Sequence, residues 1–362
     1  MERLGLVGLP NAGKSSLFNA LTGANAVVAP HPFSTTETTA GIAQVYDERL
    51  WKLAEMSESR KVVPAGVEFV DIAALAKGAS TGEGLGNRFL GSLREVDALV
   101  YVLRAFEDPS VVTATGGDPD PAEDLATLEF ELVLADLAAV QGRLHRQQKA
   151  AKGDKSLLRE IAALEKAQVA LDEGTPLYRA TLDPEERELL KQSFLLTTKA
   201  ILTVVNIGED QLDDVASVVA PVEAELAGRA EVLGMCVQLE AEAAQLTMEE
   251  RAEMLEALGL GEGALPRFLH AAYHLLGLRT FFTTGEKESR AWTFRAGWKA
   301  PQCAGVIHGD FERGFIAGEI VAYHDLAELG SYPKCREKGK LRIEGKEYVM
   351  KDGDVVEWRF NV

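Results

Sequence analysis

The chain has 362 residues, and 46% of them are hydrophobic, which allows two or three domains with packed cores. The formal net charge of -18 argues against a protein that is basic throughout and coats nucleic acid. The three cysteines lie far apart without a CxxC pair and the six histidines are scattered, so the sequence signals neither a disulfide framework nor a zinc site.

Residues 4–22 predict a strand, a glycine-rich loop and a helix in succession. Residues 4–7 are apolar, as in a buried strand, and apolar residues recur at helical spacing after Ser16. Between them, Gly8 and Gly13 bracket four residues and precede Lys14 and Ser15, which is the P-loop pattern in the context that it requires. The backbone N–H groups of such a loop and the start of its helix favour phosphate. We therefore expect a bound nucleoside triphosphate, with the Ser15 hydroxyl on Mg²⁺ and phosphate contacts from Asn11, Ala12, Gly13, Lys14, Ser15 and Ser16.

Residues 1–118 alternate between strand and helix signals, which predicts a doubly wound, mostly parallel α/β sheet. The predicted strands are 4–7, 42–46, 67–71 and 98–104, and the predicted helices are 14–22, 48–57 and 87–96. The sheet pattern returns at 200–205 and 231–237 and is followed by helices near 247–258 and 264–276. We assign residues 1–118 and 198–277 to one nucleotide-binding domain.

Residues 119–197 interrupt this pattern with helical signals. Leucines recur among charged and alanine residues from Asp124 to about Ala151, and two further helical runs cover 155–172 and 184–193. The last run begins with Asp183-Pro184, an N-cap followed by proline at the first helical position. We predict an antiparallel helical hairpin inserted into the α/β domain, an element that more often docks a partner than performs catalysis.

From Leu278 onward, short strand signals at 281–284, 291–294, 318–322 and 354–360 predict a small mixed β domain over 278–362. This region has 14 basic and 13 acidic residues, whereas the rest of the chain has a net charge of -19. Five basic residues within nine positions indicate a contact with an RNA phosphate backbone, and solvated surface charge is the alternative. These residues are Lys334, Arg336, Lys338, Lys340 and Arg342.

Two further segments supply candidate Mg²⁺ partners. The loop 31–41 is rich in hydroxyl groups and lies where a nucleotide switch places a mobile loop, so we choose Thr35 as the second Mg²⁺ hydroxyl. A threonine-rich surface loop is the alternative. Asp71 ends the apolar strand 67–71, and an acid at the C-terminal tip of a strand beside a P-loop is the expected partner behind the metal. We therefore assign Lys14, Thr35 and Asp71 to catalysis.

The base-reading loop is predicted at Asn206-Ile207-Gly208-Glu209, directly after the strand 200–205. A guanine-selective loop usually has Asn-Lys-x-Asp, whose carboxylate accepts two hydrogen bonds from guanine. Here Ile207 replaces the lysine and Glu209 is one methylene longer than aspartate. A misplaced bidentate contact costs about 1–3 kcal/mol, so we expect a weakened guanine preference, and the Asn206 amide is able to pair with adenine. A plain turn at the strand end is the alternative.

Together these residues resemble the Obg-like ATPase family, also called YchF, a branch of the translation-factor P-loop NTPases. The resemblance spans the chain and implies a G-domain, an inserted helical hairpin and a C-terminal β-grasp TGS domain. It also implies ATP hydrolysis with GTP tolerated, and association with ribosomes. The motifs that carry it are GLPNAGKSS (8–16), PFSTTE (32–37), DIAALAKGASTGEGLGNRFL (71–90), RAFED (104–108), NxxE (206–209), LEAEAAQL (239–246), GVIHGDFERGFI (305–316) and YVMKDGDVVEWRFNV (348–362).

Two positions depart from the family pattern. The switch pattern is Asp-x-x-Gly, but Ala74 stands three residues after Asp71 and restricts positive φ, which puts the switch geometry in doubt. The family often has a histidine on the strand before RAFED, whereas this chain has Tyr101. Tyrosine is a poor base near neutral pH because its reference pKa is about 10. We interpret Tyr101 as a strand residue and expect turnover slower than in relatives.

The sequence offers no glutamine to orient the attacking water and no evident arginine finger, so we expect slow ATP hydrolysis that a partner such as the ribosome accelerates. Two alternatives remain open: a nucleotide-gated RNA- or ribosome-binding module with negligible turnover, and a guanine-specific GTPase switch. Asn11 lies where some P-loop switches bind K⁺, so K⁺ is a second candidate ion beside Mg²⁺.

The expected partners are ATP or GTP and the ribosome or ribosomal RNA, with no DNA. Neither an apolar run of 18 residues nor a signal peptide is present in the sequence, so we expect a cytoplasmic protein without a membrane partner. We expect a monomer.

Overall fold

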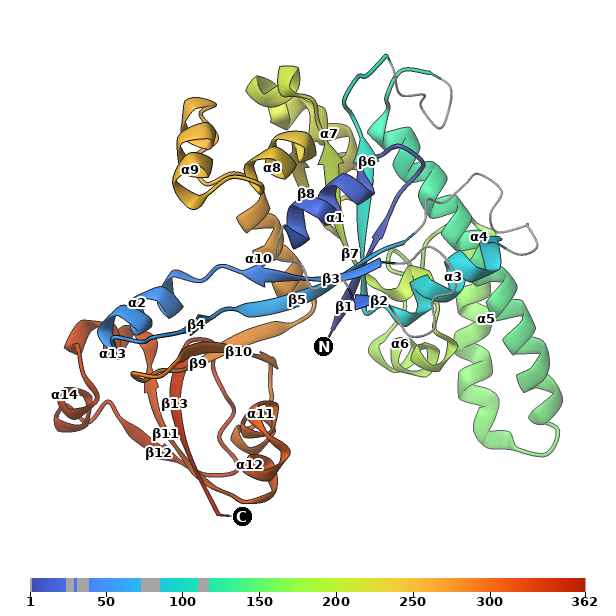
Figure 1. Ribbon diagram of the computed structural model, residues 1–362. Helices are drawn as coiled ribbons and strands as arrows, with labels where there is room; N and C mark the ends of the chain where they lie inside the picture. Colours follow the sequence, from blue (N-terminus) through green and yellow to red (C-terminus); the bar gives the residue numbers. More distant parts are fainter. Residues whose placement is uncertain (1, 24–28, 31–38, 73–84, 110–116, 362) are drawn as a thin grey trace. The chain divides into compact units, whose positions relative to one another are not determined.

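The structure is a computed structural model and describes residues 2–23, 29–30, 39–72, 85–109 and 117–361. The chain divides into two compact units, Met1–Ile42 with Glu68–Phe268, and Ala43–Val67 with Leu269–Val362 (Figure 1). The helical insertion 119–197 is grouped with the first unit.

Residues 43–67 differ from the sequence-based division, which places them in the nucleotide-binding domain. The structure groups them with the C-terminal region, with which they also make polar contacts. Arg49 of α2 (Glu48–Met56) forms an ion pair with Asp352 at 2.7 Å, and the Ser59 hydroxyl donates to the Gly285 carbonyl over 2.8 Å. Such long-range pairing leaves no mark on local sequence periodicity.

The first unit is built around a seven-stranded sheet with the order β2-β3-β5-β1-β6-β7-β8. The pairs β5–β1, β1–β6, β6–β7 and β7–β8 are parallel and β2–β3 is antiparallel, which confirms the doubly wound, mostly parallel prediction. In a parallel sheet the strand ends collect loops at one edge, where ligands bind. The strands are β1 Arg3–Val7, β2 Ala29–Pro30, β3 Thr39–Val45, β5 Ala65–Asp71, β6 Ala98–Arg104, β7 Ala200–Asn206 and β8 Glu231–Met235.

Helices pack against this sheet through the alternating residues of its strands. Leu99, Tyr101 and Leu103 of β6 belong to a core that also contains apolar residues of α3 (Leu85–Glu95), α4 (Pro121–Ala150) and α7 (Val215–Leu226). The remaining helices of this unit are α1 Lys14–Thr22, α5 Leu158–Asp172, α6 Pro184–Leu190, α8 Val237–Ala243, α9 Met248–Ala257 and α10 Leu265–Leu275, of which α10 continues into the second unit.

The predicted helical hairpin is present as α4 and α5, with α6 packed beside them (Figure 1). The Asp120 side chain caps α4 by accepting hydrogen bonds from two backbone N–H groups, and Asp183 caps α6 in a capping box with Glu186. Between the helices lies a separate apolar core that includes Val140, Leu164 and Leu190. The hairpin therefore has its own hydrophobic support.

Two helices of the first unit were not predicted. Helix α7 has the sequence VASVVAPVEAEL, in which β-branched residues and Pro221 disfavour a helical interpretation. Helix α8 begins at Val237, so the predicted strand 231–237 is two residues too long, because strand β8 ends at Met235. Both helices are held by tertiary packing, since Val219, Val222 and Leu239 lie in the core of the sheet.

The second unit contains a six-stranded sheet with the order β12-β11-β13-β9-β10-β4, consistent with the predicted β domain. Its apolar core includes Phe281, Phe294 and Ile320. Four short helices in this unit were not predicted, because helices of five to eight residues show too little periodicity. The strands are β4 Val62–Val63, β9 Leu278–Thr283, β10 Ser289–Arg295, β11 Phe315–Ala322, β12 Arg342–Glu344 and β13 Asp354–Phe360, and these helices are α11 Ala300–Ile307, α12 Gly309–Arg313, α13 Tyr323–Leu329 and α14 Tyr332–Glu337.

Within the residues that the structure describes, none of the helices combines the length and the apolar character that a membrane crossing requires.

Candidate functional site

The glycine-rich loop between β1 and α1 follows a tightly curled path that needs two of its glycines. A Cβ atom on Gly8 would lie 2.3 Å from the Val102 carbonyl oxygen. Gly13 has φ 97 and a Cβ there would lie 2.3 Å from the Asn206 amide nitrogen. Asn11 also has a positive φ of 64, in the left-handed region that asparagine tolerates. The loop is therefore wound against β6 and β7, as a P-loop must be to turn its N–H groups inward.

Lys14 begins helix α1 and is buried, with 7% of its surface exposed. Its ammonium group donates a hydrogen bond to the Leu9 carbonyl over 2.9 Å, which holds it against the loop. Burial lowers the pKa of Lys14 to about 8, while the nearby Asp71 carboxylate acts in the opposite direction. Because Gly13 offers no side chain to cap α1, the first N–H groups of the helix are available to an anion.

Ser15 and Asp71 are brought together from elements that are far apart in sequence. The Ser15 hydroxyl donates to Asp71 Oδ2 over 2.7 Å, and Asp71 stands at the end of β5. Burial raises the pKa of Asp71 above its usual value, whereas the Ser15 hydrogen bond and Lys14 lower it. A hydroxyl and a carboxylate oxygen in contact are hard oxygen ligands of the kind that Mg²⁺ takes beside phosphates. These two side chains therefore fit a magnesium site.

Two residues of the predicted metal site and switch fall outside the described residues. Thr35, which is predicted as the second Mg²⁺ hydroxyl, belongs to the segment 31–38, and Ala74 belongs to 73–84. The roles assigned to these two residues therefore stay predictions.

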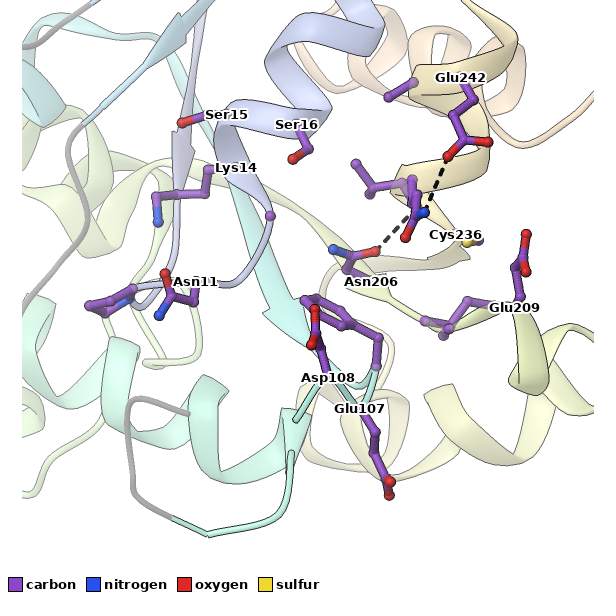
Figure 2. A pocket seen from close by; sticks show the side chains of 18 of the residues that line it. Asn11, Lys14, Ser15, Ser16, Glu107, Asp108, Asn206, Glu209, Cys236 and Glu242 are labelled. Atoms are coloured by element: carbon purple, nitrogen blue, oxygen red, sulfur yellow. Dashed lines mark hydrogen bonds between the residues drawn. The ribbon is translucent and has the colours of Figure 1, made fainter. Parts of the chain in front are cut away.

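Asn206, at the end of β7, connects the phosphate loop to the start of helix α8. Its Nδ2 donates to the Ala12 carbonyl over 3.0 Å. Its Oδ1 accepts from the Val237 N–H over 3.2 Å, the bond drawn as a dashed line at Asn206 in Figure 2. Only 5% of Asn206 is exposed. The amide thus holds the phosphate loop and the start of α8 together. It still has one N–H and one oxygen lone pair that form no hydrogen bond to these two groups.

The other residues of the predicted base loop differ in their environment. Ile207 is buried in the core of the sheet, and its N–H donates to the Met235 carbonyl over 3.0 Å. Glu209 is exposed at the start of a 3₁₀ turn, Glu209–Asp214. Figure 2 shows Lys14 and Ser15 on one side of Asn206 and Glu209 on the other. The loop therefore separates a phosphate side from a far side of the same cavity.

These residues line one cavity of about 1000 Å³. A volume of this size is at the upper end of the range for small-molecule and cofactor sites. Its walls also include residues that the sequence did not assign to the site, although they lie within or directly beside the motifs RAFED, NxxE and LEAEAAQL. These additional lining residues are Phe106, Glu107, Asp108, Pro109, Asp210, Cys236, Val237, Gln238, Ala241, Glu242 and Gln245.

Tyr101 does not line this cavity in the described part of the chain. It is 1% exposed and lies in the core shared with α3, α4 and α7. Burial, followed by the nearby Glu129 carboxylate, raises the pKa of Tyr101 well above its usual value. The interpretation of Tyr101 as a strand residue is confirmed.

The five basic residues predicted to contact RNA lie in the second unit, on α14, on β12 and between them. Three of them have acidic neighbours: Arg336 pairs with Glu319 at 3.0 Å, Lys340 with Asp325 at 3.0 Å, and Arg342 with Glu344 at 3.3 Å. Lys334 and Lys338 are exposed, and neither forms an ion pair with another described residue. Much of the cluster's charge is therefore neutralised within the unit.

Comparison with known proteins relates the whole chain to one family. A family model for the C-terminal domain of YchF GTPases, described as "Protein of unknown function (DUF933)", matches residues 278–361, and a model described as "50S ribosome-binding GTPase" matches residues 3–116. The solved structure of the Schizosaccharomyces pombe YchF GTPase is similar with a TM-score of 0.86 and 36% identity, covering 99% of this chain and 97% of that one.

Curated relatives give the same result. Proteins named "Ribosome-binding ATPase YchF" from Bacillus subtilis and Haemophilus influenzae are 48% and 43% identical, in each case over 99% of both chains. With this identity over its full length, and with the P-loop, the inserted hairpin and the C-terminal β domain in place, the chain belongs to the YchF family.

Proposed function

We propose that this protein is a ribosome-associated P-loop NTPase that hydrolyses ATP to ADP and phosphate as a Mg²⁺-dependent switch. The contact between Ser15 and Asp71 beside Lys14 carries this proposal, because it joins a hydroxyl, a carboxylate and a cation in the wall of a nucleotide-sized cavity. The names of the relatives, which are ribosome-binding ATPases, support the choice of ATP and of the ribosome.

The phosphate side of the site works by positioning and charge neutralisation. The N–H groups of residues 11–16 hold the phosphates, and Lys14 leaves the Leu9 carbonyl to contact them. The Ser15 hydroxyl and the Asp71 carboxylate, together with the predicted Thr35 hydroxyl, would hold Mg²⁺ at this position. Mg²⁺, when bound, neutralises the charge that develops on the phosphoryl oxygens. Asn11, at the loop bend, is the candidate contact for K⁺ as a second ion.

The base side of the site holds the purine against Asn206, Ile207 and Glu209. Asn206 is already engaged on both amide groups, so its remaining N–H and lone pair are what it offers to adenine. Glu209 occupies the loop position at which Asn-Lys-x-Asp proteins have the aspartate that reads guanine. We infer that ATP is preferred and GTP is tolerated, and competition between the two nucleotides for one site tests this.

Turnover without a partner is slow in this proposal. Among the described residues that line the cavity there is no arginine, and the glutamines, Gln238 and Gln245, come from the α8 side. An arginine finger supplied by a partner is worth about 10³–10⁵ in rate. This composition also favours a second candidate, a nucleotide-gated binding module whose hydrolysis only resets the bound state.

The partner in both cases is the ribosome, which places the protein in the cytoplasm. In this proposal the helical insertion 119–197 and the β domain 278–362 act as docking domains. Lys334 and Lys338 carry the contact with RNA in the β domain, because the other three basic residues of that cluster are paired.

Phosphate release from ATP, measured with and without purified 70S ribosomes, tests the proposal. We expect Mg²⁺-dependent hydrolysis by the purified protein, at least tenfold stimulation by ribosomes, and loss of both in the Lys14→Ala variant. Binding of ATP with equal, negligible hydrolysis under both conditions would favour the binding module. Absence of binding to either purine triphosphate would overturn both.

A further inference from the structure

The turn of the helical hairpin carries a concentration of positive charge that contrasts with the rest of the chain. Residues 143–159, which we call the hairpin tip, contain six basic residues and a single acidic residue, Asp154. Their net charge is +5, whereas the remaining 345 residues carry a net charge of -23. From Leu137 to Gly153 the sequence has no acidic residue at all. The positive charge is therefore confined to one end of one element.

Four of these cations are exposed and have no acidic partner among the described residues. Arg146 and Lys149 lie on the last turns of α4, Lys152 lies in the turn, and Lys155 begins the return to α5. The Asp154 carboxylate is engaged by the Ser156 N–H and hydroxyl, at 2.9 Å and 2.6 Å. We refer to Arg146, Lys149, Lys152 and Lys155 as the tip cations. Unlike Arg336, Lys340 and Arg342 in the second unit, they keep their charge available to a partner.

Helix stability accounts for only part of this arrangement. Arg146 and Lys149 lie near the C-terminus of α4, where a cation interacts favourably with the helix dipole. Lys152 lies outside the regular helices, and Lys155 precedes the N-terminus of α5, where a cation is unfavourable. Arg159 is also in the first turn of α5, but it pairs with Glu185 at 2.9 Å. The charges of Lys152 and Lys155 therefore call for a different explanation.

Hydrogen bonds fix the two helices of the hairpin relative to each other at the tip. The Arg143 guanidinium donates to Glu160 over 2.6 Å and to the Gln192 carbonyl over 2.7 Å, and Gln147 donates to the same Glu160 carboxylate. These bonds join α4, α5 and the segment after α6 at the base of the tip. Figure 1 shows the turn between α4 and α5 at the free end of the hairpin. A surface fixed in this way loses little conformational entropy when it binds.

We propose that the tip cations form a binding surface for the phosphate backbone of RNA, through which the hairpin contacts ribosomal RNA. This inference rests on the proposed association with ribosomes and names the surface that carries it. Residues 143–159 contain no Phe, Trp or Tyr but six basic residues, so we expect contacts with the phosphate backbone, which carry no sequence information, to dominate. An acidic protein segment is the competing kind of partner.

Charge reversal at the tip cations in the full-length protein tests the inference. The variant carries Arg146→Glu, Lys149→Glu, Lys152→Glu and Lys155→Glu, four exposed substitutions that leave the nucleotide site untouched. The matched control carries Arg60→Glu, Lys287→Glu, Lys346→Glu and Lys351→Glu, which changes the net charge equally at exposed basic residues of the second unit outside the cluster 334–342. Circular dichroism and ATPase rate without ribosomes verify that both variants are folded.

The probes are purified 70S ribosomes and, separately, a protein-free RNA duplex of 30 base pairs, each titrated at several salt concentrations. The slope of log Kobs against log[salt] is negative, and each lost phosphate contact reduces its magnitude by about 0.9. We expect the tip variant to bind both probes at least tenfold more weakly than wild type, with a slope smaller by about 3 to 4, and the control to lose less than the tip variant.

Each contrary result points to a different failure. Wild-type and tip-variant proteins that bind both probes equally would overturn the inference while leaving ribosome association intact. Loss of ribosome binding with unchanged duplex binding would replace RNA by an acidic protein segment as the partner. A wild-type protein that binds duplex RNA through the tip but does not bind ribosomes would refute the ribosomal role alone.

Discussion

Replacing Asn206 with aspartate separates a bracing role of this residue from a base-reading role. The substitution preserves size and keeps an oxygen that accepts from the Val237 N–H, but it replaces the Nδ2 donor with an oxygen 3.0 Å from the Ala12 carbonyl. An unsatisfied buried carbonyl costs about 1–3 kcal/mol. Placing an ionised carboxylate at a position that is 5% exposed adds to this cost, so we expect the free energy of unfolding to fall by about 2–4 kcal/mol at pH 7.5.

The pH dependence of this loss has a defined sign. Burial beside a carbonyl oxygen raises the pKa of the introduced carboxyl in the folded state above its value of about 3.9 in the unfolded chain. The folded state therefore binds the proton more tightly, and the stability defect shrinks as the pH falls through the raised pKa toward 4. Asn206→Ala, which removes both hydrogen bonds without adding a charge, is the control and lacks this pH dependence.

Urea denaturation at several pH values measures the stability, and competition of ATP and GTP against a fluorescent nucleotide measures the affinities. If Asn206 is mainly a brace, both affinities fall by similar factors and their ratio changes less than threefold. A tenfold change in the ratio with unchanged stability would refute the brace and make Asn206 a base reader.

Three further predictions follow from the same geometry. Gly13→Ala should weaken ATP binding at least tenfold in equilibrium titrations, because a Cβ there meets both φ 97 and the Asn206 amide at 2.3 Å; unchanged affinity would mean that the loop relaxes freely. ATP affinity should fall as the pH rises above about 8, since Lys14 then loses its charge in the free protein, and Lys14→Met should abolish this slope. Tyr101→Phe should change the ATPase rate less than twofold in a phosphate-release assay, because Tyr101 is 1% exposed in the core; a tenfold loss would assign its hydroxyl to catalysis.

Local patterns were sufficient to predict the parallel sheet, the hairpin helices and the phosphate loop. These features depend on period, capping residues and glycine spacing, which a sequence displays directly. The proximity of Ser15 and Asp71 also followed, because the ends of adjacent parallel strands meet at one sheet edge.

Features that depend on long-range packing were not predictable in the same way. Helix α7 forms despite Pro221 and its β-branched residues, because Val219 and Val222 pack in the core. The bracing bonds of Asn206 connect β7 to the phosphate loop and to α8, and nothing in the four residues 206–209 signals them. The grouping of residues 43–67 with the C-terminal unit has the same origin, in contacts with residues more than 200 positions away.

Helix α4 has a further consequence for how the protein meets a polyanion. Its first sixteen residues contain Glu123, Asp124, Glu129, Glu131 and Asp136, and its last fourteen residues lead into the basic turn. At about 1.5 Å per residue, these opposite charges are spread over a rod of roughly 45 Å, so a negatively charged particle repels one end while it attracts the other. We expect the resulting torque to orient the molecule before contact. The turn between α4 and α5 then meets the polyanion first, and the acidic nucleotide-binding domain faces away from it.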